Sequence, residues 1–212
     1  MIYGLCLLFG ALLFGIAGLF HPMLEGDGAA QLATIAGTGG WRAIHWALLF
    51  ALPFMYIGLS GVALRHGATA GAAAARGGVR LAAFAFAVWA LNILFMAAGG
   101  WHLAGAYRVS DTGLTASHAV FVYDMLHPAG LAAERLATFA LGLVVYLFSR
   151  AMLSGGIYPR WLAWAGFLVA AVAGMVGLVV GESTPNPYYY SQAGVVVWLA
   201  ATGALTMGRI RA

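Results

Sequence analysis

The histidines are the side chains of this sequence best suited to chemistry. Neutral imidazole is a common metal ligand and also serves as an axial ligand of haem. Four of the six histidines flank long apolar runs, in the order His21, His45, His102 and His127. His21 closes the first run and His45 lies in the first turns of the second. Four helices holding these side chains at a similar depth would let them converge on one cofactor.

Two cofactor chemistries fit this pattern. A b-type haem would be held from opposite sides by His45 and either His102 or His127, for electron transfer. Alternatively a zinc, copper or iron ion would be held by several of His21, His45, His102, His127 and Asp124. Asp124 and His127 are three residues apart and share a face if that segment is helical. Haem needs two opposed ligands, whereas a metal ion needs three or more converging within ~2.0–2.2 Å of one point.

Two charged residues lie where they could support the histidines. Arg42 precedes His45 by three residues, and Glu134 follows His127 on the same face of a helix. Glu134 could pair with Arg42, or it could orient a liganding histidine from behind. The plainer alternative is that Glu134 and Arg135 extend to the membrane interface.

Other polar residues have simpler expected roles. His118 and Glu25 lie in the segments that join the same ends of the runs, and both could support the site. Asn92 is the deepest strongly polar residue of the third run, and we expect it to form an interhelical hydrogen bond. His66, beside Arg65, is expected to be an ordinary interfacial residue.

The composition requires a membrane environment for these histidines. The chain is 63% hydrophobic and 8% charged, with a mean hydropathy of +0.92, beyond the apolar share of a soluble domain. Its apolar runs reach the roughly 20 residues needed to cross a bilayer. We therefore predict an all-α, polytopic membrane helical bundle as one domain over residues 1–212. The six predicted spans are approximately residues 2–20, 43–64, 81–100, 129–153, 161–180 and 192–207.

The arginines predict the orientation of this bundle, since the chain has no lysine. With a cytoplasmic N-terminus, seven arginines face the cytoplasm and only Arg42, Arg108 and Arg135 face the other side. This distribution follows the positive-inside rule. Both termini are then cytoplasmic, and the histidine-rich face lies on the opposite side of the membrane.

Several classes of protein are excluded or disfavoured. The net charge of +4 is spread over loop ends, where topology explains it, so we expect no nucleic-acid partner. Cys6 is the only cysteine and can form no internal disulfide. The sequence contains no His-Glu-x-x-His motif and no phosphate-binding Gly-x-x-x-x-Gly-Lys loop.

The segments around the spans also carry predictions. Residues 65–80, rich in Gly, Ala and Arg, are expected to form a flexible connector. Residues 115–126 could form a short helix on the membrane surface, and His127-Pro128 would then mark the start of the fourth span. Pro53 is expected to kink the second span and to shape a cavity beside it.

One segment resembles a known group of proteins. Gly155-Gly156-Ile157-Tyr158-Pro159-Arg160-Trp161-Leu162-Ala163-Trp164 resembles a loop of bacterial six-helix membrane proteins catalogued as domains of unknown function. The resemblance covers this loop and the flanking spans. It implies six spans and a bacterial inner membrane, and it supplies no activity and no functional residue.

These observations favour an integral membrane protein that binds haem b or a metal ion on its periplasmic side. Its partners would be the lipid bilayer and a redox partner or other membrane subunits. The competing hypothesis is an accessory subunit of a larger complex with no cofactor, whose histidines would be scattered around the bundle. A small-molecule transporter or membrane enzyme is the third.

Overall fold

The computed structural model describes residues 1–109, 113–179 and 185–208, without the side chains of residues 113–114 and 185–189. The described regular structure is entirely helical, which confirms the predicted all-α class. The elements are α1 (Ile2–Leu19), α2 (Gly28–Gly37), α3 (Trp41–Arg65), α4 (Ala72–Leu94), the π-helix η1 (Phe95–Gly100), α5 (Trp101–Val109), α6 (Gly113–Gly155), α7 (Arg160–Val179) and α8 (Pro185–Met207).

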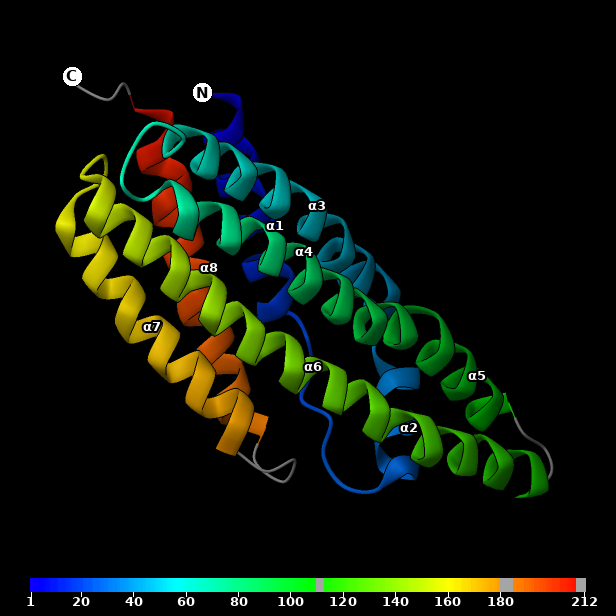
Figure 1. The fold of residues 1–212 in the computed structure, drawn as a ribbon. Helices are drawn as coiled ribbons and strands as arrows, with labels where there is room; N and C mark the ends of the chain where they lie inside the picture. Colours follow the sequence, from blue (N-terminus) through cyan, green and yellow to red (C-terminus); the bar gives the residue numbers. More distant parts are fainter. Residues whose placement is uncertain (110–112, 180–184, 209–212) are drawn as a thin grey trace.

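Six long helices form a closed ring. Around the ring, α1 packs on α3, α3 on α4, α4 on α6, α6 on α7, α7 on α8, and α8 on α1. The first turns of α1 contact the last turns of α8, because a Cβ on Gly4 would lie 2.7 Å from the Gly203 carbonyl oxygen. Met1 and the end of α8 therefore lie together, with the α3–α4 and α6–α7 connections (Figure 1). We call this the terminal end of the bundle.

Five helical stretches are long and apolar enough to cross a membrane. They are α1, α3, α7, the continuous stretch from α4 through η1 to α5, and α6 from Thr115 onward. The described part of α8 is not among these five, although α8 completes the ring. The structure thus supports a multi-pass membrane protein.

The third predicted span differs from the observed helix at both ends. Helix α4 begins at Ala72, within the segment predicted to be a flexible connector, and the helical stretch runs on to Val109. The segment from Ala72 is rich in alanine, the strongest helix former, which outweighs its glycines. The flexible-connector prediction was therefore wrong for residues 72–80.

The fourth predicted span is also part of a longer helix. Helix α6 runs for 43 residues and passes through Pro128, where a helix start was predicted. The separate surface helix expected at residues 115–126 is the first part of this same helix. Proline removes one intrahelical hydrogen bond, to the carbonyl of Asp124, and Pro128 is exposed, so its ring meets no packed neighbour.

The two long helical stretches extend beyond what a membrane can cover. At about 1.5 Å per residue they span about 57 and 65 Å, against a hydrocarbon core of about 30 Å. The parts of these stretches that extend beyond such a core pack with α2. Helix α2 begins after Asp27, whose carboxylate accepts a hydrogen bond from the Ala30 amide at 2.9 Å. We call α2, α5 and residues 115–127 of α6 the cap.

The cap has its own apolar core, separate from the core of the ring. Its buried members are Leu32, Ile35, Trp41, Met96, Ala104, Ala119 and Tyr123. The Tyr123 hydroxyl also donates a hydrogen bond to Gln31 at 2.9 Å, which ties α6 to α2. Because Trp41 begins α3 and Met96 lies in η1, these two residues join the cap to the ring.

Close helix contacts fix the ring beneath the cap. Gly58 of α3 lies against Leu7 of α1, so near that an added Cβ would be 2.4 Å from the Leu7 Cβ. Between α3 and α4, an apolar groove of about 470 Å³ opens beside Pro53, where a cavity was expected. Leu49, Tyr56 and Phe86 are among its lining residues.

Candidate functional site

Two of the predicted histidines meet where the ring joins the cap. His21 directly follows the end of α1, where the amides of Phe20 and His21 bond to carbonyls three residues back. Pro22 then disfavours a further helical turn. His45 lies one turn inside α3 and is only 2% exposed. The packing of α1 on α3 brings these two side chains together.

The two imidazole rings face each other through their Nε2 atoms. The two Nε2 atoms are 3.2 Å apart, which is the distance of a hydrogen bond between the rings. The Nδ1 atom of His45 lies 2.8 Å from the Trp41 carbonyl oxygen. A carbonyl can only accept, so His45 Nδ1 carries the hydrogen and donates it. In neutral His45 the lone pair is therefore on Nε2 and points at His21.

Trp41 supports both imidazole rings. Its indole ring centre lies 4.3 Å from that of His45 and 5.1 Å from that of His21. The buried indole N–H donates a hydrogen bond to the Met96 carbonyl at 2.8 Å. Met96 belongs to the π-helix η1, a type of turn that often occurs at functional sites. Elements α1, α3 and η1 thus position the pair together.

Burial affects the charge of His21, which lies outside the spanning helices. Desolvation lowers the pKa of His21 below the ordinary value of 6.5, and a hydrogen bond to the Pro22 carbonyl partly opposes this effect. His21 is therefore mostly neutral at pH 7. Neutral imidazole is the form that binds a cation through its lone pair.

The spacing of the two nitrogens decides which ligand geometry they match. With metal–nitrogen distances of ~2.0–2.1 Å, a separation of 3.2 Å gives an angle at the metal of about 100–105°. This angle is close to that of a tetrahedral site, which would leave two positions open. Two ligands on opposite faces of a haem would lie about 4 Å apart, twice one such bond.

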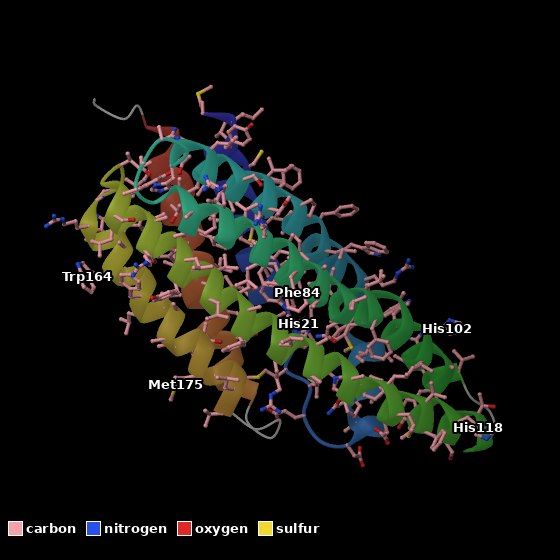
Figure 2. All side chains as sticks on the ribbon, viewed as in Figure 1. His21, Phe84, His102, His118, Trp164 and Met175 are labelled. Carbon is pink, nitrogen blue, oxygen red and sulfur yellow. The ribbon has the colours of Figure 1, made fainter. Side chains whose placement is uncertain are left out.

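The other predicted ligands lie elsewhere. Figure 2 shows His102 and His118 near the tip of the cap, apart from His21 and from each other, and both are exposed. His127 is partly buried and stacks on Tyr123, with ring centres 4.7 Å apart. Among the described residues, no group of three or more His, Cys, Asp or Glu side chains gathers as a metal site.

Two of the predicted charged neighbours are exposed, and the other two contact residues outside the pair. Glu25 and Arg42 are exposed. The carboxylate of Asp124 lies against the first residue of α2, since a Cβ on Gly28 would be 2.0 Å from Asp124 Oδ1. The hydrogen bonds that the structure shows for Glu134 come from Asn92 and Gln192, and not from Arg42 as one prediction had it.

Sequence reasoning missed the support that Trp41 gives. Trp41 lies just before the predicted second span and was not among the expected site residues. Its spacing of four residues from His45 was the available signal, because that spacing places both on one helix face. The π-helix that receives its hydrogen bond leaves no comparable mark in the sequence.

A second buried histidine lies at the terminal end. His66, expected at the interface, is 0% exposed and stacks on Tyr158 with ring centres 5.7 Å apart. Thr69 donates its hydroxyl hydrogen to the His66 carbonyl, so Thr69 Oγ1 accepts from His66 Nδ1 at 3.2 Å. His66 Nε2 is buried and has no hydrogen-bond partner among the described residues. Burial lowers the pKa of His66.

The chain matches no family model, and no curated protein or solved structure is significantly similar to it. The geometry of the His21–His45 pair is therefore the main guide to function.

Proposed function

We propose that this chain is an integral membrane protein that binds one transition-metal ion between His21 and His45. The observation that carries the proposal is the 3.2 Å separation of the two Nε2 atoms. The hydrogen bond from His45 Nδ1 to the Trp41 carbonyl supports it. Metal-binding histidines commonly donate their other ring N–H in this way, which fixes the ring and its tautomer.

A metal ion suits the pair better than the haem that the sequence also suggested. The angle implied by the spacing is near tetrahedral, whereas haem ligation needs opposed nitrogens. Zinc, copper and iron all accept imidazole ligands. Two protein ligands would leave two positions for water or a substrate, one more than in catalytic zinc sites with three protein ligands. Copper or iron would make this a redox site, and zinc would make it a Lewis-acid site.

Metal content and absorption of the purified protein test the proposal together. We expect about one metal ion per chain, no Soret band, and loss of the ion in both His21→Ala and His45→Ala. His102→Ala is the matched control, because His102 is exposed in the cap. A Soret band dependent on His45 would establish haem instead. Metal-free protein, even after incubation with Zn²⁺ or Cu²⁺, would favour the accessory-subunit hypothesis.

The proposal includes an orientation in a bacterial inner membrane. We take α8 as the sixth span, with both termini cytoplasmic and the cap periplasmic. The described arginines support this orientation. Those at the terminal end of the ring are Arg65, Arg76, Arg80, Arg150 and Arg160, and those toward the cap are Arg42, Arg108 and Arg135.

Cysteine labelling tests this orientation in a Cys6→Ser background. An impermeant thiol reagent should label a cysteine replacing exposed His118 in intact spheroplasts. It should label a cysteine replacing exposed Arg160 only after lysis. The reverse pattern would invert the topology.

A further inference from the structure

The carboxyl group of Glu134 joins three helices through neutral hydrogen-bond donors. The Asn92 carboxamide on α4 donates to Glu134 Oε2 at 3.2 Å. The Gln192 carboxamide on α8 donates to Glu134 Oε1 at 2.8 Å. Both oxygens of this α6 side chain therefore have amide partners. The expected interhelical hydrogen bond of Asn92 is confirmed, and Glu134 is its acceptor.

This cluster lies far from the terminal end of the bundle. At about 1.5 Å per residue, Glu134 is about 30 Å from Gly155 along α6, and Asn92 is about 30 Å from Ala72 along α4. This distance equals the thickness of a hydrocarbon core, so the cluster lies near the boundary of the core on the cap side. An ionisable side chain that faces the other helices of a membrane bundle is usually functional.

The Asn92 carboxamide also presents an unused acceptor beside the carboxyl group. Its Oδ1 atom is buried and has no hydrogen-bond partner among the residues that the structure describes. It lies against Gly130, one turn before Glu134, where an added Cβ would be 2.5 Å away. A buried acceptor without a donor is unfavourable. A second arrangement of the cluster, in which the Glu134 carboxyl group is the donor, would satisfy this acceptor.

The two arrangements correspond to two protonation states of Glu134. An ionised carboxylate only accepts hydrogen bonds, and the observed amide donors suit that state. A protonated carboxyl group donates one hydrogen bond. Rotation of the Asn92 carboxamide would turn Oδ1 toward Glu134 Oε2 to accept it, with the amide group moving to the Gly130 side. The same side chains can thus serve both states.

The charged and titratable groups that the structure describes on the surrounding helices are few. On α6 itself the neighbours are Arg135 and His127, and on α8 the nearest titratable side chain is the exposed Tyr190. The titratable residues of α4 and α7 are arginines at the terminal end: Arg76, Arg80 and Arg160. Glu182 lies outside the described residues.

We propose that Glu134 is a reversible proton-binding site, with Asn92 and Gln192 as positioning residues that accommodate both protonation states. The site is separate from the histidine pair, and its test does not depend on metal binding.

Infrared difference spectroscopy of the full chain in lipid nanodiscs tests the proposal. Between alkaline and acidic pH, we expect a C=O stretch of a buried, protonated carboxyl group, with a small shift in D₂O. The band should be absent in Glu134→Gln and retained in Glu25→Gln, an exposed acid. A spectrum unchanged by Glu134→Gln would overturn the proposal.

A second variant keeps the test decisive if Glu134→Gln does not fold. Asn92→Leu removes a hydrogen bond from both states, but the bond to the ionised carboxylate is the stronger of the two, so the midpoint of the infrared titration should move to higher pH by about one unit. A midpoint unchanged in Asn92→Leu, or no titrating buried carboxyl band in the wild-type protein, would contradict the assignment.

Discussion

Replacing Gly58 with alanine should strain a contact between α1 and α3, the two helices whose packing brings the histidine pair together. The added Cβ would lie 2.4 Å from Leu7 Cβ and 2.7 Å from the Leu7 Cα and N atoms. Packed carbon atoms prefer separations of about 3.5–4.0 Å, so α1 and α3 must move apart by about 1 Å. His21 lies just beyond the end of α1, and His45 belongs to α3, thirteen residues or about 20 Å from Gly58. A displacement of either helix as a rigid body therefore changes the separation of the pair.

The expected energetic cost follows from two opposing effects. Overpacking a helix contact costs about 1–3 kcal/mol. Alanine regains up to about 1 kcal/mol over glycine as a helix former. We expect a net loss of about 1–2 kcal/mol in the free energy of unfolding. A rigid-body shift of about 1 Å also exceeds the ~0.2 Å tolerance of metal–ligand distances. The affinity of the histidine pair for Co²⁺, used as a probe ion, should then fall at least about tenfold.

Gly18→Ala is the matched control, because nothing lies within 4 Å of a Cβ added at that position of α1. Unfolding in the same mixed micelles would be compared for the two variants, followed by Co²⁺ titration of each. Gly18→Ala should be at least as stable as the wild-type protein. Equal stability of the two variants would refute the close α1–α3 packing. Reduced stability of Gly58→Ala with unchanged Co²⁺ affinity would show that this packing does not set the histidine spacing.

Two further predictions concern buried rings. Burial lowers the pKa of His66 in the folded protein below 6.5, so just below that pH the unfolded chain binds more protons than the folded one. The free energy of unfolding should therefore fall as the pH drops below 6.5, by up to about 1.4 kcal/mol per pH unit. His66→Asn should flatten this dependence and exposed His118→Asn should not; identical profiles would count against a buried neutral His66. Trp41→Phe should lower the free energy of unfolding by about 1 kcal/mol, because the hydrogen bond to Met96 is lost. Equilibrium unfolding of Trp41→Phe and of the exposed control Trp164→Phe tests this prediction. An equal loss in the free energy of unfolding for the two variants would contradict it.

The sequence predicted the helices whose ends coincide with the ends of apolar runs. The spans expected at residues 2–20, 43–64 and 161–180 agree within two residues at each end with α1, α3 and α7. Apolar composition could not show that α6 extends beyond the predicted span at residues 129–153. The extension is stabilised by packing within the cap and does not depend on contact with lipid. Helix α2 was missed for the same reason, since it is held by cap contacts that are distant in sequence.

Part of the candidate site was predictable and part was not. His21 and His45 were expected at the same end of neighbouring spans, and the α1–α3 packing places them together. His102 was expected at the same depth as His21 and His45. The helix continues from α4 through η1 into α5, and this places His102 in the cap. His66 was misplaced because its burial depends on Tyr158, more than ninety residues away, and no local pattern reports such a contact.

Pulsed EPR of the Cu²⁺-loaded protein tests the central claim most directly, because it detects the non-coordinating nitrogen of each copper-bound imidazole. The His21–His45 site predicts two imidazole ligands in the wild-type protein. One should remain in His21→Ala and one in His45→Ala under conditions that retain copper, whereas His102→Ala should keep both. A signal from fewer than two imidazoles in the wild-type protein, or one unaffected by replacing His21 and His45, would contradict the proposed metal site.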